Sequence, residues 1–233
     1  MRHGFVVLAL VAACGKAPGA YDIEVDGMDE LCLLGAGDPA WAARVVAEEG
    51  LALSGPRPRL TLCATRGAFG GLAFAEAIFA VELAPEGDQQ ASMLVHAVNS
   101  RATFAWIERV RNLSPYTSGE VDHSTDPAGI RLAVATAAGR VVAASRGAPV
   151  TLAPAPSVFE GKIHQPGRSW FGARLEGGAT TAPFDPAVDR FEVGEDAADP
   201  LAAALRASGF VPDTWFIRPT AKHAKDDTVV EGG

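Results

Sequence analysis

Short apolar runs separated by turns follow one another along most of this chain, and this succession restricts its fold more than any other feature. Alternating or continuous apolar runs predict strands, and the clearest are residues 60–65, 72–83, 91–98, 130–136, 140–145 and 158–164. Turns rich in Gly and Pro separate them, and helices do not alternate regularly with strands. The sequence therefore predicts an α+β fold that is predominantly antiparallel β, barrel-like or sandwich-like.

Two or three short helices are expected among these strands. Residues 39–49 follow Asp38 and begin with Pro39, which are a preferred N-cap residue and a preferred first-turn residue. The same Asp-Pro start and a closing glycine surround residues 200–207. Residues 101–113 are helix-like and carry several charged side chains.

The N-terminus has the order of an export signal. A basic start at Arg2 is followed by the apolar residues 5–11 and by small residues before Cys14. This order predicts a lipoprotein signal peptide over residues 1–13 and a lipidated Cys14. The alternative is that the apolar run is a buried first strand, because it is too short to cross a bilayer, which takes about 20 residues.

The signal divides the chain into four parts. Residues 14–20 form a linker, residues 21–221 a single β-rich domain, and residues 222–233 a flexible tail. We expect the domain to lie outside the cytoplasm in a bacterial cell envelope, attached to the membrane through the lipid on Cys14 alone.

The formal net charge of −8 and the lack of a basic stripe argue against nucleic acid as a partner. A small molecule is the expected partner.

Two cysteines remain after Cys14. In an oxidising compartment Cys32 and Cys63 can form a disulfide, and the alternative is that they are two buried free thiols. Neither lies at metal-ligand spacing from another ligand, so a zinc site is not expected. We expect neither a metal nor a cofactor.

Three polar positions within or beside predicted strands have alternative interpretations. His96 is a candidate ligand-binding residue or a hydrogen-bonded histidine of the core or the surface. Glu76 is a carboxylate within an apolar run, and we expect it to point outward into solvent, because an inward carboxylate has to be paired or protonated. His123 with Asp122 and Asp126 fits either a metal cluster or a polar turn, and we favour the turn.

The densest group of polar residues lies in the middle of the chain, between residues 92 and 119. Glu108 shares a helix face with Arg111 and Asn112, at spacings of three and four. These residues form a solvated ion pair, or else Arg111 and Asn112 enter a cavity together with Tyr116. An Arg fork there suits a carboxylate or carbonyl group.

This central stretch resembles a motif of the acetoacetate decarboxylase-like family. The order of predicted elements from residue 21 to about 154 is similar, and RNLSPYTS resembles the family's R-E-L-S-x-Y-P-K. The residues that agree are Arg111, Leu113, Ser114 and Tyr116, and the residues that differ are Asn112, Thr117 and Ser118. Ser118 stands at the position of the family's Schiff-base lysine.

The resemblance implies a β-rich fold around a cavity, but it does not extend to imine chemistry. An imine forms by attack of an amine on a carbonyl carbon, and the hydroxyl of Ser118 cannot do this. We therefore expect a protein that binds a small organic carboxylate or carbonyl compound without Schiff-base catalysis. Its ligand-binding candidates are Arg111, Asn112, Tyr116 and His96, and we expect it not to be an enzyme.

Two alternatives stay open. The first is a divergent enzyme of the lyase or hydrolase type, in which Glu76 or Glu108 is a general base and Arg111 holds an anionic substrate. The second is a structural or interaction lipoprotein of the envelope, which would present a contiguous exposed apolar patch.

Overall fold

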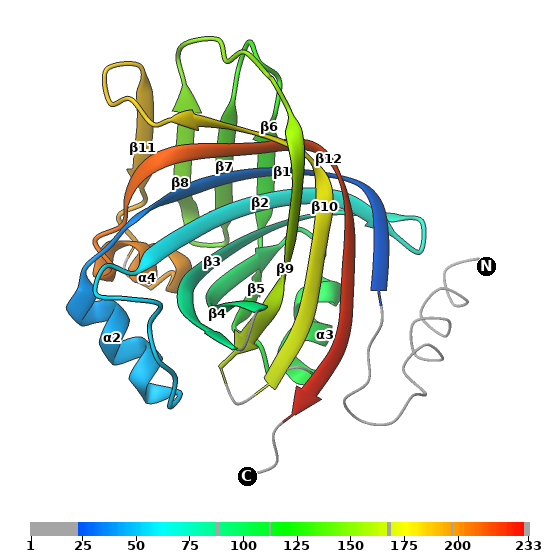
Figure 1. The fold of residues 1–233 in the computed structure, drawn as a ribbon, viewed down its shortest axis with the longest axis vertical. Helices are drawn as coiled ribbons and strands as arrows, with labels where there is room; N and C mark the ends of the chain where they lie inside the picture. Colours follow the sequence, from blue (N-terminus) through cyan, green and yellow to red (C-terminus); the bar gives the residue numbers. More distant parts are fainter. Residues whose placement is uncertain (1–22, 87–88, 112, 167–168, 197, 231–233) are drawn as a thin grey trace.

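The computed structural model describes residues 23–86, 89–111, 113–166, 169–196 and 198–230. This part contains twelve strands and three helices (Figure 1). The strands are β1 Ile23–Ala36, β2 Arg59–Phe69, β3 Leu72–Glu86, β4 Gln89–Asn99, β5 Tyr116–Ser118, β6 Glu120–Ser124, β7 Arg131–Thr136, β8 Gly139–Arg146, β9 Ala155–Gln165, β10 Ser169–Pro183, β11 Asp189–Val193 and β12 Val211–Val230. The helices are α2 Pro39–Glu48, α3 Ala102–Arg111 and α4 Pro200–Ala207.

Seven strands form a closed barrel in the order β3-β2-β1-β12-β10-β9-β4, and pairing of β3 with β4 completes the ring. All of these contacts are antiparallel except that between β4 and β9. The short strand β5 pairs in parallel with the end of β4 and extends the barrel wall there. The predicted α+β, predominantly antiparallel fold is confirmed, and its architecture is a mixed barrel.

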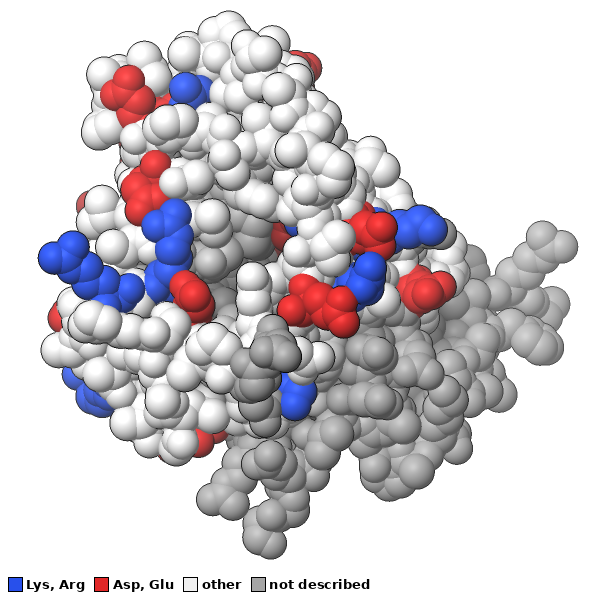
Figure 2. Space-filling view, viewed as in Figure 1, with Lys and Arg blue, Asp and Glu red and all other residues white. Residues whose placement is uncertain are grey.

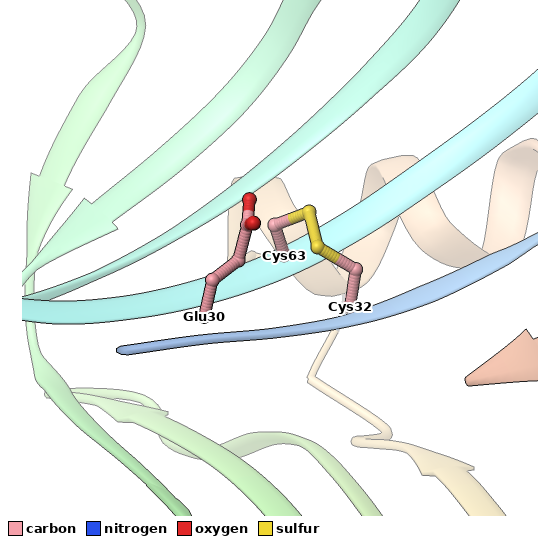
Figure 3. A group of neighbouring side chains, drawn as sticks. All are labelled: Glu30, Cys32 and Cys63. Carbon is pink, nitrogen blue, oxygen red and sulfur yellow. A yellow bond between two sulfur atoms is a disulfide. The ribbon is translucent and has the colours of Figure 1, made fainter. Parts of the chain in front are cut away.

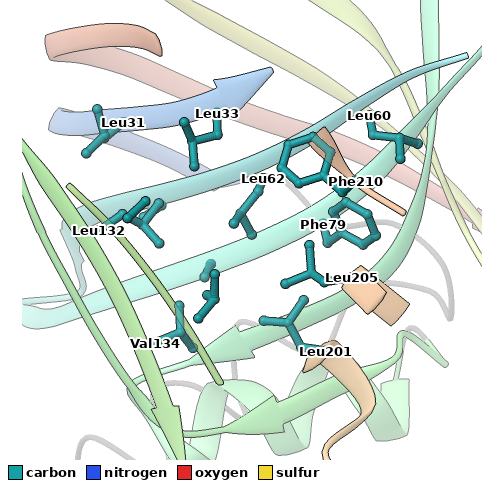
Figure 4. Packing of buried hydrophobic residues seen from close by; sticks show 14 of the residues in the cluster. Leu31, Leu33, Leu60, Leu62, Phe79, Leu132, Val134, Leu201, Leu205 and Phe210 are labelled. Atoms are coloured by element: carbon teal, nitrogen blue, oxygen red, sulfur yellow. The ribbon is translucent and has the colours of Figure 1, made fainter. Parts of the chain in front are cut away.

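A second sheet, β11-β8-β7-β6, packs against the outside of one part of the barrel wall (Figure 1). The main hydrophobic core lies between the two sheets, where Leu62 and Phe79 of the barrel meet Leu132 and Val134 of the second sheet (Figure 4). Helix α4 closes the edge of this core with Leu201 and other apolar side chains. The barrel wall is therefore covered by protein at these outward positions.

The predicted helix starts are confirmed. The Asp38 side chain accepts a hydrogen bond of 2.8 Å from the Ala40 amide at the start of α2. The Asp199 side chain accepts one of 3.0 Å from the Ala202 amide at the start of α4. Each aspartate satisfies an amide that has no partner within its own helix.

The two strands nearest the chain ends are longer than predicted. Strand β1 is continuous through Gly27, whose φ of 69° accommodates an irregularity in the pairing with β12. Strand β12 runs to Val230 and pairs with both β1 and β10. The prediction of a flexible tail from residue 222 was wrong as far as residue 230. The polar composition that suggested a tail belongs to a strand whose backbone pairs with β1 as far as Lys225 and with β10 as far as Val230.

The predicted signal peptide, the linker and Cys14 lie outside the described residues, as do residues 231–233. Among the described helices, none has both the length and the apolar composition needed to cross a bilayer.

Charges of both signs lie next to one another on the face viewed in Figure 2. On the outward side of the barrel, Arg174 pairs with Glu160 at 2.6 Å and with Glu176 at 3.2 Å. Arg59 of β2 pairs with Asp213 of β12 at 2.8 Å. Such exposed pairs contribute little to stability.

Candidate functional site

The register of six adjacent strands aligns a row of mostly polar side chains across the barrel wall. Residues opposite one another on paired strands project to the same face of a sheet. Following the pairings from β12 through β1, β2, β3 and β4 to β5 gives Arg218, Glu30, Thr65, Glu76, Asn99 and Ser118. We call this set the interior polar row.

The row faces the inside of the barrel. The next positions along the same strands, such as Leu31, Ala77 and Ile217, belong to the core between the barrel and the second sheet. Because successive side chains alternate between the faces of a sheet, residues beside Leu31 and Ile217 point the other way. Glu30 and Arg218 are therefore interior.

A buried ion pair lies at the β12 end of the row. Arg218 Nη1 donates a 2.6 Å hydrogen bond to Glu30 Oε2, and Nη2 donates one of 3.1 Å to the Ser157 hydroxyl. The guanidinium carbon also lies 4.9 Å from the centre of the Phe216 ring. Burial raises the pKa of Glu30, and the positive charge of Arg218 offsets only part of this effect.

The Nε–H donor of Arg218 has no partner among the described residues. The side chain of Arg218 is 2% exposed, and its Nε has no hydrogen-bond partner in the described part of the chain. A buried donor without a partner costs free energy, so native structures rarely contain one without a water or a ligand nearby. Arg218 is therefore the strongest candidate in the row for contact with a ligand.

Glu76 lies on the inward face and not, as predicted, in solvent. Its Oε2 accepts a 3.0 Å hydrogen bond from the amide of Asn99 on the neighbouring strand. The Asn99 side-chain oxygen in turn accepts a 2.9 Å bond from the Arg101 amide at the start of α3. Asn99 thus holds one oxygen of the interior carboxylate and links it to the helix.

A second row lies two residues along the same strands, and it also faces inward. It contains Phe216, Cys32, Cys63, Ile78, Ala97 and Tyr116. Cys32 and Cys63 are joined by a disulfide with an S–S distance of 1.99 Å (Figure 3). Tyr116 is buried and packs with Leu94, Ala97 and Ala105 of α3.

Solvent reaches part of the interior. Side chains on the inside of a closed barrel are fully buried unless the barrel encloses or opens onto space. Thr65, Glu76, Ile78 and Phe216 face inward and are only partly buried, and Ser118 at the end of the row is exposed. The interior is therefore accessible beside the polar row.

Of the central segment, the structure places Tyr116 and Ser118 on the inward face of the barrel. Arg111 is the last residue of α3, and its side chain, like all of Asn112, lies outside the described residues. Glu108 is 8% exposed on the buried side of α3. The opposite side of the helix exposes Trp106 and Val110 to solvent.

His96 lies on the other side of the barrel wall from the polar row. It pairs with Phe79 of the inter-sheet core, and its Nε2 lies 3.1 Å from the hydroxyl of Thr117. Burial lowers the pKa of His96 to about 4, although the charge of Asp199 acts in the opposite direction. The structure thus does not bring His96 together with Tyr116, and His96 is a neutral histidine of the core.

His123 is held by partners other than Asp122 and Asp126. Its Nε2 lies 2.7 Å from Asp29, which also pairs with Arg66. Asp122 pairs with Arg131 at 3.2 Å, whereas Asp126 accepts a 2.9 Å hydrogen bond from the Ala128 amide. Asp122 and His123 lie in strand β6, and Asp126 lies at the start of the turn that follows, so the favoured polar turn is right for Asp126 alone. Among the described residues, these three side chains form no metal cluster.

The sequence reasoning missed Glu30 and Arg218. Both are charged residues at the ends of apolar runs that were predicted to be strands, next to LCLL and TWFI. A charge at an inward position of such a run was the available signal. Their proximity depends on the pairing of β1 with β12, which no local pattern specifies.

Comparison with known proteins adds evidence for the fold. No protein-family model matches this chain, and no curated protein matches it significantly in sequence. The enduracididine biosynthesis enzyme MppR, solved with the condensation product of pyruvate and imidazole 4-carboxaldehyde, aligns with a TM-score of 0.59 and 12% identity over 91% of this chain and 88% of its own.

Two further solved structures are similar. Acetoacetate decarboxylase from Legionella pneumophila aligns with a TM-score of 0.58 and 10% identity, over 88% of this chain and 86% of its own. An acetoacetate decarboxylase-like enzyme from Sphingomonas wittichii aligns with a TM-score of 0.56 and 11% identity, over 93% of this chain and 95% of its own. The fold implied by the RNLSPYTS motif is confirmed, and this chain has an acetoacetate decarboxylase-like fold.

Proposed function

We propose that the barrel interior binds a small organic acid, with Arg218 as the residue that holds its carboxylate or carbonyl oxygen. The observation that carries the proposal is the buried Nε donor of Arg218, which has no partner among the described residues and lies beside interior side chains, such as Thr65 and Phe216, that are partly exposed. Guanidinium groups bind carboxylates through two parallel N–H donors, and such bonds are strong where water is excluded.

Two glutamates of the interior polar row determine which small acids the site prefers. Glu30 fixes the orientation of the guanidinium through its 2.6 Å bond, so that less rotamer freedom is lost when a ligand binds. Glu76 presents a carboxylate, which favours a ligand that also carries a hydroxyl or an enol. These two features together fit a small keto or hydroxy acid.

Binding without imine chemistry is the preferred form of this proposal. Ser118 occupies the end of the row, at the position that the motif assigns to the Schiff-base lysine, and no residue of the row is a lysine. The similar solved structures are enzymes, which supports a small-molecule site in a barrel of this type. A hydroxyl group cannot take over the attack of an amine on a ketone.

A second candidate function is catalysis by a carboxylate base. Glu76 supports it, because this residue is interior, partly exposed and held through one oxygen by Asn99. Glu76 would remove a proton next to the carbonyl group, while Arg218 stabilises the resulting oxyanion. Turnover that is lost in Glu76→Gln, with ligand binding retained, would favour this function over simple binding.

An interaction role is the third candidate. Trp106 and Val110 are 54% and 56% exposed, and their spacing of four places them on one face of α3. Leu113, just beyond the helix, is 55% exposed. Contiguous exposed apolar side chains are typical of contact surfaces. Self-association that disappears in Trp106→Ser, measured by sedimentation, would support this role.

We further propose that the domain is anchored in a bacterial cell envelope by lipid on Cys14. The support is the order of basic, apolar and small residues before this cysteine. A disulfide between Cys32 and Cys63 suits an oxidising compartment.

The experiment that tests ligand binding is calorimetric titration of the domain with a panel of small keto, hydroxy and aromatic acids. Arg218→Lys keeps the charge but loses the planar fork, so the affinity should fall about tenfold or more. Arg174→Met is the matched control, because Arg174 pairs with two glutamates on the outward face. The absence of binding by any acid, or equal loss in both variants, would refute the proposal.

A further inference from the structure

Three potential metal ligands lie together inside the barrel. Ligand atoms of Glu30, Cys32 and Cys63 are all within 4.8 Å of one another, and Figure 3 shows the carboxylate beside the two sulfurs. Glu30 and Cys32 project to the same side of β1, and Cys63 is the direct partner of Cys32 on β2. All three residues are buried, with exposures of 8%, 2% and 6%.

We propose that reduction of the Cys32–Cys63 disulfide creates a binding site for a thiophilic divalent cation such as Zn²⁺, held by both thiolates and by Glu30. Two sulfurs and one oxygen form a donor set that Zn²⁺ binds readily. The paired β1 and β2 backbones hold the two cysteine Cα atoms 4.0 Å apart, which keeps the sulfurs close after the bond is broken. The proposal does not depend on the organic ligand proposed above.

Arg218 supports the proposed metal site through Glu30 and is not itself a metal ligand. Its Nη1 bonds to Glu30 Oε2, which leaves the second oxygen of the carboxylate for a metal. A hydrogen bond from the next shell orients a ligating carboxylate in this way in many metal sites. Two thiolates and one carboxylate carry three negative charges, and Arg218 with a divalent cation carries three positive ones. The buried site is therefore neutral.

The chemistry has two balanced steps. A dithiol reductant forms its own disulfide and delivers two electrons and two protons, so that the Cys32–Cys63 bond gives two thiols. The cation then displaces these two protons as it binds the thiolates. Three protein ligands leave the fourth tetrahedral position of Zn²⁺ open to water or to a small molecule in the barrel.

The linear sequence argued against zinc because the cysteines are 31 residues apart and no other ligand flanks them at the usual spacing. The fold supplies the spacing by placing the cysteines opposite each other on neighbouring strands. The oxidised protein, with its sulfurs bonded to each other, has no thiolates to offer. The site is thus present in one redox state and absent in the other.

The test compares the oxidised and the reduced wild-type chain, so its outcome does not depend on whether a variant folds. The protein is reduced with a phosphine, freed of reductant under argon, and titrated with Zn²⁺ against a chromogenic chelator. Reduced protein should bind one equivalent and oxidised protein none. Co²⁺ should give a near-ultraviolet thiolate-to-metal charge-transfer band in the reduced form alone.

Two variants identify the ligands. Glu30→Gln should weaken Zn²⁺ binding by more than about tenfold, since loss of a hydrogen bond to a ligating residue alone has an effect of that order. Glu160→Gln changes an exposed carboxylate on the outward face of the barrel and should bind as wild type does. Equal binding by the oxidised and reduced chains, an unchanged affinity in Glu30→Gln, or an equal loss in Glu160→Gln would each overturn the proposal.

Discussion

Arg218 and Glu30 are 188 residues apart in the chain and are joined by a 2.6 Å hydrogen bond inside the barrel. The bond connects β12 to β1, the pairing through which the last strand enters the barrel. Two buried charges lose hydration, and their mutual attraction regains this loss only with good geometry and further hydrogen bonds. The Ser157 hydroxyl supplies one such bond.

Removing one partner of this pair should destabilise the protein strongly. Arg218→Met leaves Glu30 buried and unpaired, and we expect a loss of about 3–5 kcal/mol in the free energy of unfolding. The double variant Glu30→Met with Arg218→Met should recover most of that loss, because no isolated charge remains. Urea denaturation measures both. A single-variant loss below about 1 kcal/mol would show that the pair is hydrated and not buried.

Reduction of the disulfide should lower stability through the unfolded state. Cys32 and Cys63 close a loop with a sequence separation of 31. Chain-entropy arguments assign such a loop about 3–4 kcal/mol. Unfolding curves with and without reductant, both in the presence of a metal chelator, give the value. Identical curves would mean that the unfolded chain is as constrained without the disulfide as it is with it.

Much of the fold was predictable from local patterns, and the site was not. The Asp38 and Asp199 caps and the run of strands depend on neighbouring residues, so the sequence specified them. The predicted outward direction of the Glu76 side chain was wrong because a second sheet covers the outer side of β3. Both faces of this strand therefore carry apolar residues. Alternation cannot then distinguish inside from outside.

The interior polar row itself required the register of six strands. Arg218 and Glu30 meet only after β12 pairs with β1, and Cys32 meets Cys63 only through the register of β1 and β2. Non-local pairing also explains why the polar composition beyond residue 222 predicts a tail where the structure has a strand.

His96 should make stability depend on pH. Its pKa is lowered by burial from 6.5 to about 4, so below the unfolded-state pKa the unfolded chain binds a proton that the folded chain does not. Stability is then fully present above about pH 6.5 and decreases as the pH falls toward about 4, by about 3 kcal/mol in total.

The measurement is urea denaturation across this pH range for the wild type, His96→Gln and Thr117→Val. The histidine variant should lose this part of the pH dependence. Thr117→Val removes the hydrogen-bond partner but keeps the histidine, so it should retain the dependence. A wild type and His96→Gln with parallel pH profiles would contradict a buried neutral His96.

Lipidation of Cys14 should determine where the protein is found in a bacterial host. Wild-type protein should fractionate with membranes and carry the added mass of acyl chains on its new N-terminus. Cys14→Ser should be recovered unacylated and free of the membrane fraction. Acylation elsewhere, or membrane association unchanged in Cys14→Ser, would contradict the proposed anchor.

The most direct test of an interior site that holds small keto acids is to restore an amine at the end of the polar row. Ser118→Lys, incubated with a keto acid and reduced with borohydride, should gain the mass of one adduct at residue 118. Wild type and the exposed control Thr103→Lys should stay unlabelled under the same conditions. A folded Ser118→Lys that forms no adduct, or labelling of the control to the same extent, would contradict the account.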